Sequence, residues 1–142
     1  MKIAVFASGN GSNFQTLAEQ FPNQVKFVFS DHHDAYVLER AERLGVAKAS
    51  FELKEFSSKV DYEKALVEIL EDKEIDLILL AGYMKIIGAT MLSKYKGKII
   101  NVHPSYLPDF AGSPHAIEES HEAKKGWESV FIMLMRVLIL EN

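Results

Sequence analysis

The sequence predicts an α/β fold with a mostly parallel central sheet flanked by helices. Strand-like and helix-like segments alternate through residues 2–124, which is typical of consecutive β-α-β units. The strand-like segments are almost continuously apolar, and parallel strands covered by helices on both faces have this composition. A cluster rich in glycine, serine and asparagine follows the first strand at residues 8–13, where folds of this class bind ligands.

In the first half of the chain, apolar spacing and chain-breaking residues predict three strands and two helices. A helical pattern follows the glycine-rich cluster and ends at Pro22. Asp34 caps a second helix over residues 35–44, and Gly45 provides its stop. The expected strands are residues 2–7, 25–29 and 46–51.

The second half repeats this alternation. Ser57 or Ser58 caps a long helix that runs through Leu70 with its apolar residues on one face. Further helices are expected at residues 89–95 and 114–124, and further strands at residues 75–81 and 98–102. The last two strands lead into Gly82 and His103, so their carboxyl ends can present residues to a ligand.

The composition indicates one globular domain without disulfides. The chain has 142 residues, of which 48% are hydrophobic and 25% charged, and this size and apolar content suit a single core. Its net charge of −4 argues against a dedicated nucleic-acid binder. The absence of cysteine excludes disulfides, thiolate metal sites and cysteine nucleophiles. No signal-peptide pattern and no apolar stretch of membrane-spanning length are present, so we expect a cytoplasmic protein without membrane partners.

The glycine-rich cluster is a candidate phosphate site. It leads into the N-terminus of a helix, where backbone N–H groups converge on an anion. Gly11 would let a phosphate approach closely, and Ser12 and Asn13 would add side-chain donors. The third glycine of the dinucleotide pattern is missing, although Asp31 follows about twenty residues later, where an acid could bind a ribose. A monophosphate therefore fits better than a dinucleotide, and a tight turn with a helix cap is the alternative interpretation.

No metal site is expected in the sequence. His32 and His33 stand between two acidic residues, but adjacent residues rarely chelate one ion together. A solvated loop is the simpler interpretation of this segment.

Asn101 and His103 form a candidate catalytic pair at the end of the last strand. Residues i and i+2 of a strand point to the same face, so the amide and the imidazole can reach one reacting atom. Pro104 keeps His103 extended. An amide donor beside an imidazole suits oxyanion stabilisation and proton transfer. A hydrogen-bonded histidine at a strand end is the structural alternative.

Three motifs resemble the phosphoribosylglycinamide formyltransferase family. They are residues 7–13 (ASGNGSN), 80–84 (LAGYM) and 101–108 (NVHPSYLP), in the order and spacing of that family. The resemblance covers residues 1–126 and implies a Rossmann-like formyltransferase fold. It also implies a one-carbon transferase of purine biosynthesis, which moves a formyl group from the co-substrate 10-formyltetrahydrofolate to the amino group of glycinamide ribonucleotide.

The resemblance also implies roles for individual residues. Gly11, Ser12 and Asn13 would hold the substrate's phosphate. Asn101 and His103 would be catalytic, with Asn101 donating to the tetrahedral oxyanion and a protonated His103 supplying a proton. The folate would bind Lys59, Met84, Lys85, Ile86, Ile87 and Asn101, and His115 matches a histidine of the following loop.

Two alternatives to this function stay open from the sequence. One is a sibling formyl transferase or hydrolase that uses 10-formyltetrahydrofolate. The other is a non-catalytic nucleotide-binding module. In each case the expected partners are small molecules, and a homodimer is allowed by the sequence.

Residues 127–142 depart from the family pattern. Relatives continue with a segment like GVSVHYVDxGxDTG, whose later aspartate pairs with the catalytic histidine and favours its charged form. Possible codons for this tail, read from the last base of the Trp127 codon, spell GVSVHYVDEGVDTGK. We therefore expect an incomplete formyltransferase domain at residues 1–126, an aberrant apolar tail at 127–142 read in a shifted frame, and an inactive chain. A genuine buried strand or helix at residues 130–140 is the alternative.

Overall fold

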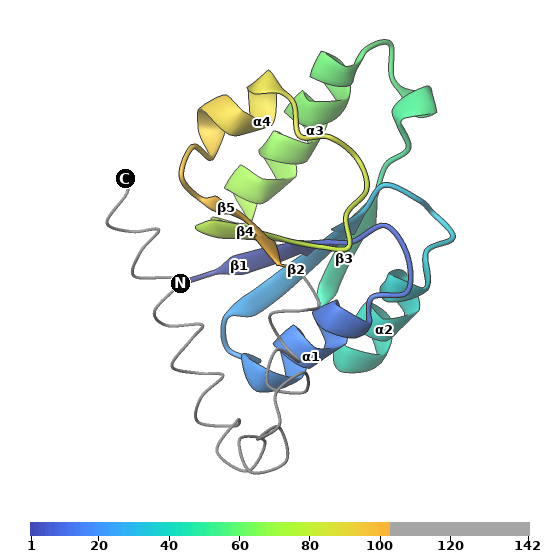
Figure 1. Ribbon diagram of the computed structural model, residues 1–142, viewed down its shortest axis with the longest axis vertical. Coiled ribbons are helices and arrows are strands. Elements are labelled where there is room, and N and C mark those ends of the chain that lie inside the picture. The colour runs from blue at the N-terminus through green and yellow to red at the C-terminus, as the bar shows by residue number, and fades with distance from the viewer. Residues whose placement is uncertain (103–142) are drawn as a thin grey trace, which may run out of the picture. The chain divides into compact units, whose positions relative to one another are not determined.

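Five parallel strands form the central sheet of the computed structural model, which describes residues 1–102 (Figure 1). These residues make up one structural unit, Met1–Val102. The strand order is β3-β2-β1-β4-β5, and every neighbouring pair is parallel. The strands are β1 Ile3–Phe6, β2 Val25–Ser30, β3 Ala47–Ser50, β4 Leu77–Ala81 and β5 Ile99–Val102. The predicted α/β fold with a parallel sheet is therefore confirmed.

Within residues 1–102, four α-helices lie against this sheet, α1 and α2 on one face and α3 and α4 on the other (Figure 1). Gly45 ends α2 in the left-handed conformation, and Ser58 caps α3 by accepting a hydrogen bond from the Asp61 N–H, as the sequence predicts. The helices are α1 Ser12–Gln20, α2 Tyr36–Leu44, α3 Lys59–Asp72 and α4 Ala89–Lys94, and a short 3₁₀ helix, η1, covers Leu53–Glu55.

The predicted cap of α2 is wrong. The N-cap residue is Ala35 rather than Asp34, and it makes no side-chain capping bond. The Val37 N–H in the first turn instead donates to the Gly9 carbonyl at 3.0 Å. The Gly9 carbonyl, a backbone acceptor from a distant loop, therefore takes the place of a side-chain cap on α2. The helix expected at residues 114–124 and the tail at residues 127–142 lie outside the described residues.

Aromatic side chains fill the core between the sheet and α3. Phe29 of β2 meets Phe6, Phe51 and Tyr62 with ring centroids 5.2, 5.7 and 6.1 Å apart. Phe56 packs edge-on against Tyr62 at 5.5 Å. Edge-to-face pairs of this kind add to the free energy gained by apolar burial. The cluster ties the segment between β3 and α3 to the middle of the sheet.

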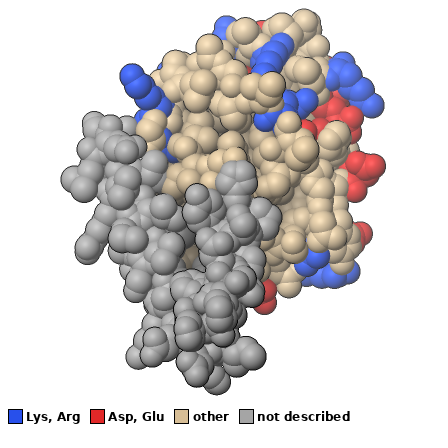
Figure 2. All heavy atoms as spheres, viewed as in Figure 1, with Lys and Arg blue, Asp and Glu red and all other residues tan. Residues whose placement is uncertain are grey.

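The surface of the described part mixes charges of both signs. In Figure 2, lysine, arginine and acidic side chains lie around the margin of the visible face, and uncharged residues occupy much of its middle. Within residues 1–102, no helix combines the length and the apolar content that are needed to cross a bilayer.

Candidate functional site

The candidate site lies where the strand order changes direction. The chain runs from β1 through β2 to β3 on one side of β1 and then returns to place β4 on its other side. In parallel α/β sheets, ligands bind beyond the carboxyl ends of the strands at such a switch point. The loop after β1 and the loop after β4 both leave the sheet there (Figure 1). The first loop leads into the predicted phosphate residues at the start of α1, and the second contains four of the predicted folate residues, Met84, Lys85, Ile86 and Ile87.

Gly11 of the first loop is required by packing and by backbone conformation. It has φ +80° and is the N-cap of α1. A Cβ atom on Gly11 would lie 2.3 Å from Val37 Cγ2 in α2. The approach of a phosphate would also favour a glycine here, but the close contact with α2 is by itself a sufficient reason for it. By contrast, a Cβ on Gly9 would meet nothing within 4 Å.

Arg40 of α2 holds the first loop from the side. Its Nε donates to the Asn10 carbonyl at 2.7 Å, and its guanidinium also donates to the side chains of Asn10 and Gln15. The guanidinium lies over the Tyr36 ring, 5.0 Å from its centroid. No local pattern in the sequence predicts this role of Arg40, because its side chain contacts a loop thirty positions away.

The helix N-terminus behind this loop has the character of an anion site. Ser12 is exposed and Asn13 is half-buried at the start of α1. Among residues 1–102, no side chain caps this end of the helix, and its first turn carries no acidic residue. The positive end of the helix dipole is therefore not neutralised by an acid in its own first turn.

Ser8 joins the first loop to the loop after β4. The Ser8 N–H donates to the Gly82 carbonyl at 3.1 Å. The Ser8 hydroxyl accepts a hydrogen bond from the Met84 N–H at 2.8 Å. These two bonds cross the switch point, so the predicted phosphate loop and the predicted folate loop start side by side.

The predicted folate loop presents apolar side chains. Met84 and Ile86 are 81% and 78% exposed, whereas Ile87 packs partly against the core. The Lys85 Nζ lies over the Tyr62 ring, 5.7 Å from its centroid. Exposed apolar side chains beside an ordered loop are typical of a surface that binds a ligand.

The other predicted residues lie on neighbouring elements. Asn101 is exposed in β5, opposite Leu80 of β4 in the strand register. Lys59 is the first residue of α3 and is half-buried. His103 and His115 fall outside the described residues, so the catalytic pairing of Asn101 with His103 stays a prediction.

The buried Tyr62 and the partly buried Tyr83 lie next to the predicted folate loop. The Tyr83 hydroxyl is 3.4 Å from the Tyr62 hydroxyl. Burial raises the pKa of Tyr62 to about 12 and also raises the pKa of Tyr83. The negative charge of Asp31 raises both pKa values further. Both phenols are therefore neutral at pH 7.

Asp31 does not reach solvent as a ribose-binding acid would. The residue is 5% exposed, and its Oδ2 lies 3.6 Å from the His32 Nε2. Its Oδ1 is buried without a hydrogen-bond partner among the described residues. The end of β2 turns this carboxylate inward, which spacing along the chain could not reveal.

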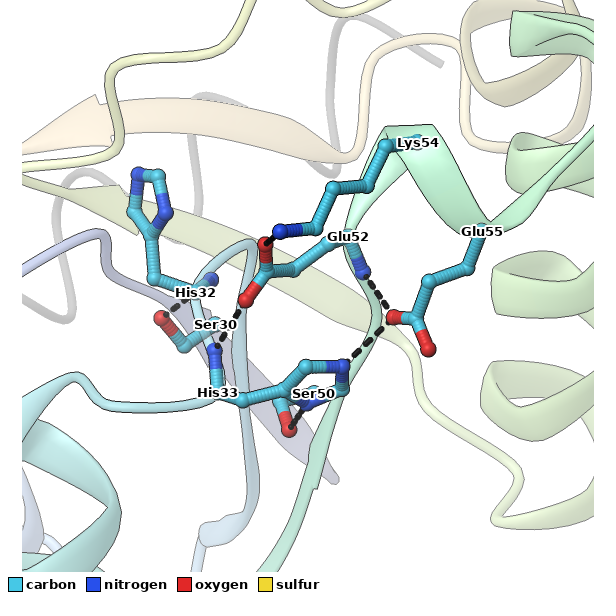
Figure 3. Close-up of polar contacts among 7 residues, drawn as sticks. All are labelled: Ser30, His32, His33, Ser50, Glu52, Lys54 and Glu55. Carbon is cyan, nitrogen blue, oxygen red and sulfur yellow. Dashed lines mark hydrogen bonds and ion pairs between the residues drawn. The ribbon is translucent and has the colours of Figure 1, made fainter.

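His33 belongs to a polar network rather than to a merely solvated loop (Figure 3). Its Nδ1 is hydrogen-bonded with the Ser50 hydroxyl at 2.6 Å, and its Nε2 with Glu55 Oε1 at 2.5 Å. Its backbone N–H donates to Glu52 Oε2 at 3.1 Å. No cluster of three metal-ligating side chains occurs within the described part of the chain. The network instead fastens the loop after β2 to η1.

The two glutamates of this network have lowered pKa values. The His33 backbone N–H, followed by Lys54, lowers the pKa of Glu52. The Glu52 backbone N–H, followed by the His33 side chain, lowers the pKa of Glu55. Hydrogen bonds to a carboxylate favour its charged form.

Known proteins with similar sequences are formyl transferases. A family model described as formyl transferase matches residues 1–137. The chain is 46% identical over 116 residues to phosphoribosylglycinamide formyltransferase of Bacillus subtilis (strain 168). It is 36% identical over 117 residues to the protein of that name from Escherichia coli (strain K12). These matches cover 78% and 79% of this chain, but only 60% and 55% of the two relatives.

Solved structures of formyltransferases are also similar to this chain. The phosphoribosylglycinamide formyltransferase from Streptococcus pneumoniae TIGR4 is 66% identical with a TM-score of 0.70, over 86% of this chain and 66% of that one. Glycinamide ribonucleotide transformylase 1 from Geobacillus kaustophilus is 42% identical with a TM-score of 0.70, over 86% and 67% of the two chains. These likenesses confirm the expected Rossmann-like formyltransferase fold.

Proposed function

Because this chain belongs to the formyl transferase family, we propose that it transfers a formyl group from 10-formyltetrahydrofolate to the amino group of glycinamide ribonucleotide. Relatives named phosphoribosylglycinamide formyltransferase support this step of purine biosynthesis. The observation that carries the proposal is the Ser8–Met84 contact, which joins the phosphate loop to the folate loop. A transfer between two substrates requires that both bind side by side.

In this proposal the nucleotide binds at the first loop. Gly11, Ser12 and Asn13 surround the start of α1, where backbone N–H groups suit a phosphate. Arg40 fixes the shape of the loop through Asn10 rather than by contacting the phosphate. The net positive end of α1 contributes further attraction for the anion.

The folate co-substrate binds at the second loop. Met84, Ile86 and Ile87 offer apolar surface to its ring system, and Lys85 offers a cation. Lys59 and Asn101 complete the proposed set of folate-binding residues. Tyr62, which lies under the Lys85 ammonium, and Tyr83 are neutral at pH 7.

The proposed reaction passes through a tetrahedral intermediate. The nucleotide's amine attacks the formyl carbon, a new C–N bond forms, and the carbonyl oxygen becomes an oxyanion. Asn101 donates a hydrogen bond to this oxygen. The bond from the formyl carbon to the folate nitrogen then breaks. That nitrogen takes a proton from His103, and the attacking amine gives its own proton to the neutral imidazole that remains.

Calorimetric titration of this chain with each substrate tests the binding half of the proposal. We expect one site for glycinamide ribonucleotide and one for 10-formyltetrahydrofolate. A chain that binds folate but not the nucleotide would be a sibling formyl transferase or hydrolase. A chain that binds the nucleotide but not folate would be a nucleotide-binding module.

An Asn101→Ala variant tests the catalytic half. In a chain with the reading frame restored at Trp127, loss of one oxyanion donor should lower turnover by about 10²–10³. The matched control is Asn23→Ala, which removes an exposed amide from the turn before β2. Turnover within a factor of a few of the unaltered enzyme would refute the role of Asn101.

We further propose that the formyltransferase domain ends near residue 126 and that residues 127–142 are read in a shifted frame. The family match reaches residue 137, beyond this boundary. A cytoplasmic location, a homodimer, and the lack of nucleic-acid and membrane partners also remain predictions from the sequence.

A further inference from the structure

We propose that Glu63 and Ser8 are positioning residues that hold the folate loop, residues 84–88, in one arrangement before any ligand binds. The proposal rests on the function proposed above, because it takes 10-formyltetrahydrofolate as the ligand of this loop. Glu63 lies outside the predicted ligand-binding set, and Ser8, although it begins the glycine-rich cluster at residues 8–13, is not one of the residues predicted to hold the phosphate. Each makes its contacts from outside the loop, one at each end of it.

Glu63 fixes the end of the loop. It lies in α3 and is 3% exposed. Its Oε2 accepts a hydrogen bond from the Gly88 N–H at 2.7 Å, and its Oε1 accepts one from the Met91 N–H at 3.2 Å. Gly88 is the N-cap of α4 and makes no side-chain cap of its own. A carboxylate from another helix therefore caps α4, and buried N–H groups that lose such a partner are costly.

The absence of a side chain at Gly88 leaves room for the Glu63 carboxylate. A Cβ on Gly88 would lie 2.8 Å from Glu63 Oε1 and 3.0 Å from Oε2. Any larger residue would push the carboxylate away from the two N–H groups. The contact of Glu63 with the junction of the loop and α4 therefore depends on a glycine at residue 88.

Ser8 fixes the start of the loop. Its hydroxyl accepts from the Met84 N–H, and its own N–H donates to the Gly82 carbonyl. Ser8 follows β1, which has 0% exposure at all four residues. The loop is therefore fastened at its first residue to the most buried strand of the sheet.

Between these two anchors, two side chains of the loop point outward, while Ile87 packs partly against the core. Met84 and Ile86 are exposed, although both are large and apolar. A free loop with such residues would lose conformational entropy when a ligand ordered it. Anchoring both ends removes much of that cost before binding, so the loss of either anchor should weaken folate binding without touching the phosphate loop's own contacts to α2.

The test compares Glu63→Gln with Glu68→Gln, which makes the same chemical change at an exposed position of α3. The glutamine amide would place a donor against a donor N–H. We expect faster hydrogen exchange at Gly88 and Met91 and about tenfold weaker binding of 10-formyltetrahydrofolate. Binding of glycinamide ribonucleotide should change less than twofold, which separates positioning from general destabilisation.

A second variant, Ser8→Ala, removes the hydrogen bond at the other end of the loop, and Ser57→Ala at an exposed position is its control. This variant tests the proposal even if Glu63→Gln does not fold. We expect faster exchange at Met84 and the same selective loss of folate affinity. Unchanged folate affinity, or an equal loss for both substrates, would overturn the positioning role. Failure of the unaltered chain to bind 10-formyltetrahydrofolate would instead overturn the proposed function, and with it the ligand assigned to this loop.

Discussion

Gly11 and Val37 pack so closely that the space for a side chain at residue 11 is already filled by α2. The nearest approach of a Cβ at this position would be 2.3 Å, to Val37 Cγ2, and the next would be 2.5 Å, to Val37 Cβ. Contacts at this distance require a shift of the backbone or of the valine. The loop after β1 and α2 therefore pack closely together, and the hydrogen bond from the Val37 N–H to the Gly9 carbonyl adds to this contact.

Replacing Gly11 should destabilise the fold in addition to any effect on binding. Gly11→Ala combines a positive φ with a steric clash, so its free energy of unfolding should fall by more than the ~1–2 kcal/mol expected from the left-handed conformation alone. Gly45→Ala is the matched control, because Gly45 has φ +70° but open space around a Cβ. Urea unfolding measures both. An equal loss of unfolding free energy in the two variants would mean that α2 shifts to make room for the added methyl group.

Gly9→Ala should separate ligand approach from folding. A Cβ at residue 9 meets nothing within 4 Å, so stability should change by less than about 0.5 kcal/mol. If the phosphate lies against this part of the loop, the added methyl group should weaken nucleotide binding. Calorimetric titration measures the affinity of the variant for glycinamide ribonucleotide. Unchanged affinity would place the phosphate away from Gly9.

Arg40→Ala should weaken nucleotide binding through the loop. The variant loses the bonds to the Asn10 carbonyl and amide, so we expect about a tenfold rise in the dissociation constant for glycinamide ribonucleotide. Arg43→Ala is the control, since Arg43 also lies against the Tyr36 ring but is exposed on α2. A similar effect of both substitutions would indicate a general charge effect rather than support of the loop.

The His33 network predicts an acid-sensitive contribution to stability. The pKa values of Glu52 and Glu55 are lowered from their ordinary value of 4.5, so unfolding raises them. Their contribution is present above about pH 4.5 and is lost as the pH falls through the lowered folded-state values. NMR titration of the two carboxyl groups provides the measurement.

Replacing His33 with alanine provides an internal comparison for this prediction. The substitution should raise the pKa of Glu55 toward its ordinary value, because an imidazole contact is lost. Glu52 should change less, because its main partner is the backbone N–H of residue 33. Equal shifts in both groups would contradict these assigned causes.

The proposed frame shift at Trp127 predicts two results. The coding DNA, read from the last base of that codon, should spell the GVSVHYVD segment of the family. A chain with the frame restored should formylate glycinamide ribonucleotide more than tenfold faster than the 142-residue chain, a barrier difference above about 1.4 kcal/mol. His103 would then regain its expected carboxylate partner. Coding DNA that allows no such reading, or equal turnover, would refute the frame shift.

The order of elements could be predicted from the sequence because each is marked locally. Apolar runs identify the buried strands, Gly45 ends α2, and Ser58 opens α3. These signals depend on residues a few positions apart. The observed strand ends lie within two residues of the predicted ones, since fraying and pairing decide the last residue.

The supports of the site could not be predicted because they join distant parts of the chain. Arg40 reaches Asn10, Glu63 reaches Gly88, and Ser8 reaches Met84 across 76 positions. No local pattern in one sequence marks such partners. Asp34 fails as a cap for the same reason, because Gly9 supplies the acceptor from another loop.

The position of β3 at one end of the strand order has a consequence for self-association. Its outer backbone edge has no strand partner among residues 1–102, and such an edge is a template for pairing with another chain. β3 is only four residues long and carries Lys48, whose ammonium is held 3.0 Å from Glu42. A short strand bearing a charge is a poor template, because adding a second copy would bury that charge. The charge of Lys48 therefore disfavours aggregation by strand pairing at the outer edge of β3.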